Sequence, residues 1–518
     1  WTHLTHSGDT KAAWTAAKKA QNKWEDAHEK RIEPDPLRLD DVERHTDLGN
    51  SFRFVRLHGC DFHFTAGRGW LAWDGTRWAA DKSGKVAQAA KSTVLSLYTD
   101  ANKLVDTLKR LIEKAGSAEA SDELRAELDK QVIEKRKLAE ALVSWARKSQ
   151  AKARIDAIIG LAQSDPTIAI LDDAFDTDAW LFNCQNGTID LRTGKLQRHT
   201  RQDCITAVSP TAYDPAAACP TWLAFLDRVF AGNAQIIGFM QRLCGYALTG
   251  STRDHVLPFL YGSGANGKST FITALQVAMG NDYAVSAAPD LLIAKRGERH
   301  PTEVADLQGK RLVTSIEVED GKRLAEGLVK QLTGGDQLKA RQMRQDFFTF
   351  APTHKMLLVA NHKPTVRGTD YAIWRRIRLI PFVVTIPEAE RDAKLPEKLA
   401  AEAAGILAWA VRGCLEWQRI GLKAPAEVMA ATEEYRTESD TLSLYLEECT
   451  VKVIGAETKA SALYSAYKTW AEASGLHPIN MMKFGLALGE RGFEKRNAGR
   501  GVIYSGIGLP QREESKGD

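Results

Sequence analysis

The chain has 518 residues, of which 44% are hydrophobic and 26% charged, a composition typical of a globular protein of roughly three or four domains. The net charge of +4 is mild, so any surface that binds nucleic acid must be local rather than spread over the whole molecule. No apolar run approaches the roughly 18 residues of a membrane span, and seven scattered cysteines without C-x-x-C spacing indicate free thiols, so we expect a cytoplasmic protein.

The first 45 residues are polar and rich in helix-forming residues, and Pro34 and Pro36 interrupt the pattern. We predict a helical linker over 1–45. The chain begins with Trp1 rather than methionine, so we expect that a domain upstream of this sequence is missing.

Residues 46–100 predict a small antiparallel sheet rich in tryptophan. Phe62-His63-Phe64 alternates as a strand does, and Asp74-Gly75 is a hairpin signal. Aromatic side chains near Arg68 and Arg77 could stack on bases. The alternative, which we favour, is that they pack the core of the small sheet.

The middle of the chain alternates between helical and strand-like patterns. Apolar stripes over 85–160, interrupted at Gly116-Ser117, predict a helical hairpin with charged outer faces. Turn residues at 186–187 and 193–194 punctuate strands within 165–215. Residues 219–250 are again helical in pattern.

A glycine-rich motif at 262–270 fits the pattern G-x-x-x-x-G-K-[ST] without mismatch. An apolar strand pattern precedes it, and a helical pattern that ends at Gly280 follows, as a phosphate-binding loop requires. Pro258 interrupts the strand, so its paired part is expected to begin near Phe259. Lys268 would reach the β- and γ-phosphates of ATP, and the Ser269 hydroxyl would bind Mg²⁺. The nucleotide-binding residues predicted here are Gly262, Ser263, Gly264, Ala265, Asn266, Gly267, Lys268, Ser269 and Thr270.

An apolar strand that starts at Leu312 runs into Glu317, Glu319 and Asp320. A P-loop ATPase needs one carboxylate to hold Mg²⁺ and one to polarise the attacking water. Glu317 is the principal candidate for both the metal and catalysis, and Glu319 is second, because alternate residues of a strand share a face. The alternative is a strand that ends in an exposed acidic loop.

Three further segments carry charged or polar side chains that could contact phosphate groups. Residues 332–347 predict a basic hairpin that could face a phosphate backbone, or equally a surface hairpin held by ion pairs. Asn361 ends a buried strand, where it could orient the attacking water or contact the γ-phosphate. Residues 374–382 place three arginines in an apolar run, and one of them could reach the γ-phosphate of a neighbouring subunit, which requires an oligomer.

Residues 440–510 predict three helices followed by a hairpin over 492–504, the pattern of a winged helix. Between 483 and 500, five cations stand against two acids, which suits a surface that contacts phosphates. The alternative is a module that docks another protein. The DNA-binding candidates in this domain are Lys483, Lys495, Arg496 and Arg500.

The order and spacing of these motifs resemble superfamily 3 helicases, and more closely the helicase half of phage and plasmid primase–helicases, kin to the poxvirus primase–helicase. The motifs are 262–270, Glu317 with Glu319, Leu332-Thr333-Gly334-Gly335-Asp336, Ala360-Asn361-His362-Lys363-Pro364 and Trp374-Arg375-Arg376-Ile377-Arg378. Upstream, Thr46-Asp47-Leu48-Gly49-Asn50, Trp73-Asp74-Gly75 and residues 186–191 look like the domain that precedes the motor in that family.

The resemblance implies an AAA+-like motor that forms a hexameric ring around DNA and steps 3′ to 5′ on a single strand. It places Glu317 at the Walker B position and Asn361 at the sensor position, and leaves open whether Arg375 or Arg376 is the arginine finger. Lys339, Arg341 and Arg344 would lie in or beside the hairpin that contacts DNA in the pore. Family members often carry a primase–polymerase domain upstream.

Together these observations predict an α/β protein: an AAA+-like P-loop motor with an α+β N-terminal domain and a C-terminal winged helix. The expected parts are a linker at 1–45, the N-terminal domain at 46–205, the motor at 206–400, a helical connector at 401–438, the winged helix at 439–510 and a tail at 511–518. We expect an ATP- and Mg²⁺-dependent DNA helicase of a bacterium or phage-infected cell, acting on single-stranded and forked DNA. The alternatives are a DNA-stimulated ATPase that loads or packages DNA without unwinding it, and a non-catalytic module that binds an origin.

Overall fold

The computed structural model describes residues 45–116, 121–288, 290–294, 302–316, 322–343, 346–366, 371–474, 476, 478–498 and 501–510. The chain divides into two compact units, Trp1–Phe175 and Asp176–Asp518. The predicted linker, apart from residue 45, and the predicted tail lie outside the described residues, as do Glu317, Glu319, Arg344 and Arg500.

The first unit contains the predicted three-stranded antiparallel sheet, in the order β1-β2-β3. Its strands are β1 (Phe62–Thr65), β2 (Gly69–Trp73) and β3 (Trp78–Ala80), and the Asp74-Gly75 turn joins the last two. The sequence before it forms helix α2 (Asp47–His58) instead of strands. The helix forms because the Thr46 side chain accepts a hydrogen bond from the Gly49 N–H, which caps its first turn.

The aromatic side chains of this sheet pack mainly inward. Phe62 and Trp78 of the sheet are buried, as is Phe54 of helix α2. Arg77 pairs with Asp74 at 3.5 Å, and Arg68 pairs with a carboxylate of the same unit. These contacts support the interpretation that the aromatic residues build the core of the sheet.

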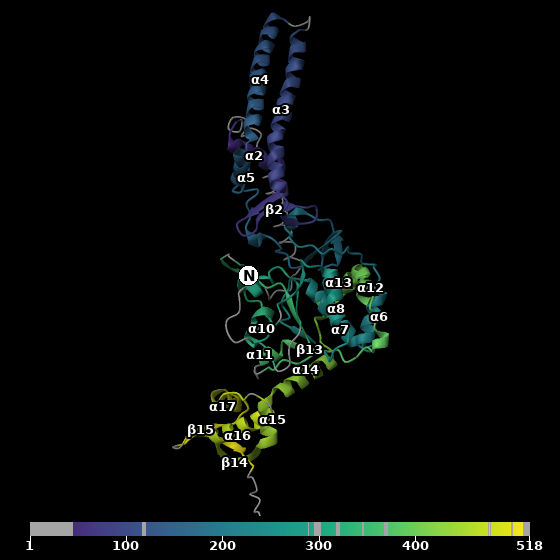
Figure 1. Ribbon diagram of the computed structural model, residues 1–518, viewed down its shortest axis with the longest axis vertical. Helices are drawn as coiled ribbons and strands as arrows, with labels where there is room; N and C mark the ends of the chain where they lie inside the picture. The colour runs from purple at the N-terminus through teal and green to yellow at the C-terminus, as the bar shows by residue number, and fades with distance from the viewer. Residues whose placement is uncertain are drawn as a thin grey trace, which may run out of the picture. The chain divides into compact units, whose positions relative to one another are not determined.

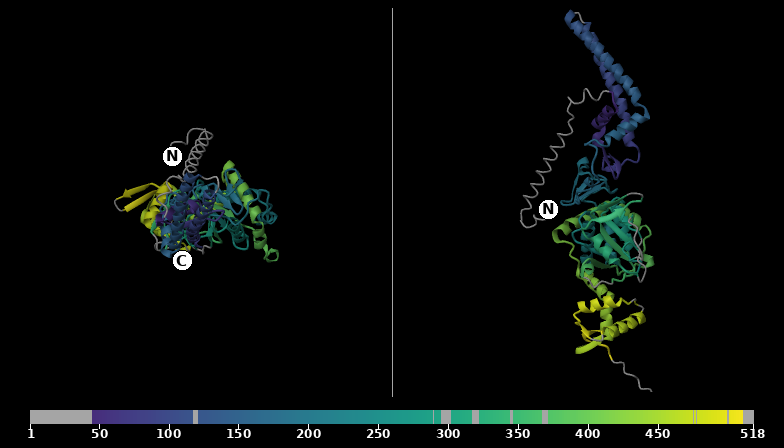
Figure 2. Two further views of the ribbon diagram at one scale, coloured as in Figure 1. Left: turned by 90° about the horizontal axis from the view of Figure 1, so that it is seen from above. Right: turned by 90° about the vertical axis from the view of Figure 1, so that its left-hand side faces the viewer.

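A helical hairpin is the longest feature of the first unit, as predicted. It consists of α3 (Lys85–Ala115) and α4 (Asp122–Ser149), which run side by side in both figures (Figures 1 and 2). Helix α3 ends at Gly116, where the sequence predicted the break. A shorter helix, α5 (Lys152–Ala162), follows.

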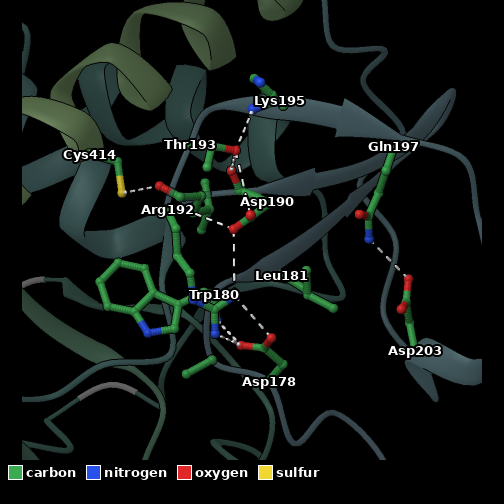
Figure 3. Close-up of polar contacts among 12 residues, drawn as sticks. Asp178, Trp180, Leu181, Asp190, Arg192, Thr193, Lys195, Gln197, Asp203 and Cys414 are labelled. Carbon is green, nitrogen blue, oxygen red and sulfur yellow. Dashed lines mark hydrogen bonds and ion pairs between the residues drawn. The ribbon is translucent and has the colours of Figure 1, made fainter. Parts of the chain in front are cut away.

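The second unit begins with a small antiparallel sheet of β4 (Leu181–Cys184), β5 (Gly187–Asp190) and β6 (Lys195–Gln197). Beside it, Arg192 forms a two-point ion pair with Asp178, at 2.8 and 3.1 Å (Figure 3). Side chains of Cys414 and Gln418 donate to the Leu191 carbonyl. The segment 176–205 therefore packs on the core of the second unit, and the division of the chain falls at 175/176 rather than at the predicted 205/206.

A five-stranded parallel sheet forms the centre of the second unit, in the order β13-β7-β12-β9-β8. The strands are β7 (Leu257–Tyr261), β8 (Ala284–Ser286), β9 (Leu312–Ile316), β12 (Lys355–Ala360) and β13 (Ile377–Pro381). Strand β7 pairs with β13 from Leu257 but with β12 only from Phe259. The Leu257 N–H donates to the carbonyl of Arg376, the residue before β13. The backbone nitrogen of Pro258 faces the other neighbour, β12, and its lack of an N–H costs no hydrogen bond there because the pairing of β7 with β12 begins only at Phe259.

Alternating residues of the sheet enter two hydrophobic clusters, one on each face. In β12, Leu357 and Val359 face one cluster, whereas Met356, Leu358 and Ala360 face the other. Figure 1 shows α6, α7, α8, α12 and α13 gathered on one side and α10 and α11 on the other. The helices on the first face are α6 (Pro220–Val229), α7 (Ala234–Leu248), α8 (Lys268–Met279), α12 (Leu395–Ala401) and α13 (Ala403–Ile420). The helices on the second face are α10 (Glu326–Thr333), α11 (Tyr371–Trp374) and the end of α14 (Ala426–Ser439).

The C-terminal part has a hydrophobic cluster of its own, which includes Tyr445, Tyr467 and Phe484. Its elements are α15 (Thr441–Cys449), β14 (Val451–Lys459), α16 (Ala460–Ala473), α17 (Met481–Glu490), β15 (Lys495–Ala498) and β16 (Gly501–Gly508). The three predicted helices and the hairpin are present. Strand β14 was not predicted; it pairs with β16, with a register shift between Lys452 and Glu457. None of the described helices is long and apolar enough to cross a membrane.

Candidate functional site

The glycine-rich loop connects β7 to α8 and takes up backbone conformations that few residues tolerate. Gly264 and Gly267 have φ of 106° and 86°, in the left-handed region that favours glycine. The segment after β13 holds the loop in place: Asn266 Nδ2 donates to the Phe382 carbonyl at 3.1 Å, and Ile386 N–H donates to the Ala265 carbonyl at 2.8 Å. Two hydrogen bonds to the segment after β13 therefore fix the loop.

Gly262 is required at the start of the loop because the backbone is crowded there. A Cβ at this position would lie 2.2 Å from Asn266 Nδ2 and 2.4 Å from the Phe382 carbonyl oxygen. A Cβ on Gly267 would lie 2.7 Å from Val229 Cγ1. Both glycines thus allow close packing that a side chain would prevent.

Lys268 opens helix α8 and is 6% exposed. Its Nζ donates to the Gly262 carbonyl at 2.6 Å and to Asn266 Oδ1 at 3.0 Å, so the ammonium group is directed into the loop. Burial lowers the pKa of Lys268, because the charged form loses hydration. Ser269, the next residue, is exposed at the same helix end.

Asn361 lies next to this loop at the carboxyl edge of the sheet. Ala360 at the end of β12 is the register partner of Tyr261 at the end of β7, so Asn361 and Gly262 follow paired residues on adjacent parallel strands. Asn361 is exposed. The structure therefore brings together the loop, the buried ammonium of Lys268 and an exposed amide.

Strand β9 ends at Ile316, the register partner of Val359 in β12. The predicted acids Glu317 and Glu319 come directly after it but lie outside the described residues, and so their roles stay predictions. Within the part of the chain that is described, no group of three or more His, Cys, Asp or Glu side chains could hold a metal ion.

The two candidate arginine fingers differ sharply in their surroundings. Arg375 is exposed, whereas Arg376 is 8% exposed. Arg376 Nε donates to Thr333 Oγ1 at 3.1 Å, and its Nη1 donates to the Ala372 carbonyl at 2.6 Å. Thr333 is the last residue of α10, and its hydroxyl in turn donates to the Val329 carbonyl one turn earlier in that helix. Arg376 thus joins two helices inside the protein, and Arg375 is the one that a neighbouring molecule could reach.

The predicted basic hairpin is present and is inserted between β9 and β12. It consists of β10 (Leu338–Arg341) and β11 (Phe347–Phe350), paired antiparallel. Lys339 and Arg341 are exposed on one face. On the opposite face, Leu338 and Ala340 are buried in the cluster that covers the central sheet.

The cationic candidates of the C-terminal part have different environments. Lys495 is exposed on β15, whereas Arg496, also exposed, pairs with Glu457 at 2.8 Å. Lys483 belongs to helix α17. Arg500 lies outside the described residues.

Sequence reasoning did not assign a role to three residues that position the site. Thr333, within the Leu-Thr-Gly-Gly-Asp motif, anchors Arg376, and Phe382 and Ile386 hold the glycine-rich loop through their backbones. The Leu-Thr-Gly-Gly-Asp motif could have indicated a structural role for Thr333. The backbone contacts of Phe382 and Ile386 leave no signal in residue type.

Comparison with known families gives two matches along the chain. The family described as D5 N terminal like matches residues 52–231. A family of unknown function (DUF5906) matches residues 260–376, which include the glycine-rich loop and Asn361.

Several curated viral proteins are similar to the chain. A "Putative helicase" of Acanthamoeba polyphaga mimivirus is 26% identical over 324 residues, which cover 58% of this chain and 34% of that protein. A "Putative helicase" of Invertebrate iridescent virus 6 is 24% identical over 455 residues, covering 76% of this chain and 46% of that protein. A "Putative primase" of African swine fever virus is 21% identical over 323 residues, which cover 57% of this chain and 33% of that protein. The chain therefore spans less than half the length of these relatives.

Among solved structures, the apo C-terminal region of NrS-1 (residues 305–718) aligns with a TM-score of 0.39 at 12% identity. The alignment covers 70% of this chain and 90% of that one.

Proposed function

The chain belongs to the family of phage and viral primase–helicases, and on that premise we propose that it is an ATP-dependent DNA helicase motor. The observation that carries the proposal is the meeting of three features at one edge of the parallel sheet: the glycine-rich loop, Lys268 and Asn361. Ligands of open parallel sheets bind at the carboxyl ends of the strands, and a loop before a helix N-terminus favours phosphate.

The residues of the loop fit ATP. Lys268 presents a buried cation where the β- and γ-phosphates would bind, and the first turn of α8 adds the positive end of a helix dipole. Ser269, with Glu317, would hold Mg²⁺, which when bound neutralises charge that develops on the phosphates. Asn361 would orient the attacking water or contact the γ-phosphate.

Arg375 would complete the site of the next subunit. Its guanidinium is exposed, and an arginine supplied in trans stabilises the charge of the phosphoryl-transfer transition state. Because the donor and acceptor surfaces differ, repeated contacts of this kind form a ring when the rotation between neighbouring subunits closes. We propose a homo-oligomer of this type, with a hexamer as the expected size.

The hairpin β10–β11 and the C-terminal part would contact DNA. Lys339 and Arg341 offer charge to the phosphate backbone of a single strand. We propose that the C-terminal part is a winged helix; its order of helices and strands supports this, and Lys495 lies on strand β15 of its hairpin. We also propose that the whole protein carries a primase–polymerase domain upstream of the motor; one relative is named a "Putative primase".

The test is a pair of assays on one preparation. ATP hydrolysis should rise when single-stranded DNA is added, and a forked duplex should be unwound in an ATP-dependent strand-displacement assay. The variant Lys268→Ala should lose both activities. ATP turnover without displacement would favour instead a motor that loads or packages DNA, and displacement by Lys268→Ala at the normal rate would show that the nucleotide site is elsewhere.

A further inference from the structure

The hairpin β10–β11 separates its side chains cleanly into two faces. The register pairs Leu338 with Phe350 and Ala340 with Phe348, and these four residues face the protein interior. The other face carries four exposed side chains, those of Lys339, Arg341, Phe347 and Thr349. This outer face shows what the hairpin presents to a partner.

Phe347 stands apart on this face because it is aromatic and 52% exposed. Arg341 is its direct partner across the hairpin, with Cζ 5.3 Å from the ring centroid, and Lys339 Nζ lies 4.9 Å from the same centroid. Two cations thus stand beside one exposed ring. The neighbours Phe348 and Phe350 already fill the inner face, so Phe347 is not needed to cover the core.

Adjacent cations and an exposed aromatic ring form a surface that can bind both phosphates and nucleobases. Lysine and arginine attract phosphates, whereas an aromatic ring stacks on a nucleobase of any identity. In duplex DNA the faces of the bases are covered by their neighbours, so stacking of this kind requires an unpaired strand.

We propose that Phe347 is a base-stacking residue of the motor, and that Lys339 and Arg341 hold the phosphates on either side of the stacked nucleotide. The proposal rests on the proposed function, in which this hairpin contacts DNA. It adds that the ligand of the hairpin is a single strand bearing bases, recognised by ring stacking and not by charge alone.

The experiment compares two fluorescent oligonucleotides of equal length and charge, one of thymidines and one of abasic sites. Binding is measured by fluorescence anisotropy with the full chain and a non-hydrolysable ATP analogue. Phe347→Leu should weaken binding of the thymidine strand at least about fivefold and leave the abasic strand unchanged. Phe347→Trp should bind the thymidine strand at least as well as the unchanged protein. Lys339→Ala should weaken both strands by similar factors.

The outcomes separate the two proposals. If Lys339→Ala weakens both strands while Phe347→Leu weakens neither, or weakens both alike, the stacking role is wrong and the hairpin still binds DNA. If neither Lys339→Ala nor Arg341→Ala changes binding of any strand, the hairpin is not the DNA contact and the proposed function loses this part. Thermal melting checks that each variant folds, and Phe347→Trp tests the stacking role independently should Phe347→Leu unfold.

Discussion

Two adjacent arginines give the sharpest test of the motor, because they have the same side chain and opposite environments. Arg375 is exposed, and Arg376 is buried between α10 and α11. We predict that Arg375→Ala abolishes ATP turnover without affecting stability, and that Arg376→Ala destabilises the protein.

The expected magnitudes follow from the contacts. Arg376→Ala removes two hydrogen bonds from a charged donor, to Thr333 Oγ1 and to the Ala372 carbonyl, and at about 1.5 kcal/mol each the loss is about 3 kcal/mol. Substitution of the exposed Arg375 should change stability by less than about 0.5 kcal/mol. Loss of an arginine finger should lower ATP turnover by about a thousandfold or more.

The assay combines thermal melting with a mixing experiment. Arg375→Ala and Lys268→Ala are each expected to be inactive, but a ring that contains both can join an intact glycine loop to an intact Arg375. With equal amounts and random assembly, about one interface in four has both parts, so the mixture should recover up to about a quarter of normal turnover.

Three results would refute this reasoning. One is normal turnover by Arg375→Ala, and another is a lowered melting temperature for Arg375→Ala equal to that of Arg376→Ala. The third is a mixture with no more activity than its components, although both variants still assemble, because the arginine would then not act between subunits.

The remaining predictions concern acid stability, the loop and the C-terminal part. His354 is 2% exposed, neither ring nitrogen has a hydrogen-bond partner among the described residues, and burial lowers its pKa to about 3. In the unfolded chain His354 binds a proton near pH 6.5, whereas in the folded protein it stays neutral until about pH 3. The free energy of unfolding therefore falls as the pH drops from 6.5 toward 3, by about 2 kcal/mol at pH 5. In denaturation experiments His354→Leu should not show this pH-dependent loss of stability, and a pH dependence equal to that of the unchanged protein would contradict the prediction. Gly262→Ala should abolish binding of a fluorescent ATP analogue, because the added Cβ would meet the Phe382 carbonyl at 2.4 Å, and binding within twofold of normal would show that the loop can move. Lys495→Ala should weaken binding to duplex DNA and reduce the slope of log K against log salt by about 1, and an unchanged slope would favour the alternative that this part docks a protein.

Much of this protein could be predicted from local sequence. The glycine-rich motif, the apolar strand before it and the helix that ends at Gly280 specify a strand, loop and helix within 24 consecutive residues, from 257 to 280, and the structure has all three. The Asp74-Gly75 turn and the break at Gly116 were readable for the same reason, since turn residues act through their own backbone conformation. The helix at 47–58 was missed because Thr46 was not recognised as its cap.

What the tertiary structure decided is which of two identical residues faces outward. Nothing in the sequence separates Arg375 from Arg376; the choice depends on Thr333, 43 residues away, whose hydroxyl accepts from Arg376. The exposure of Phe347 likewise depends on which face of the hairpin packs on the central sheet. Contacts between distant segments select among locally equivalent side chains, and no pattern of neighbouring residues records that selection.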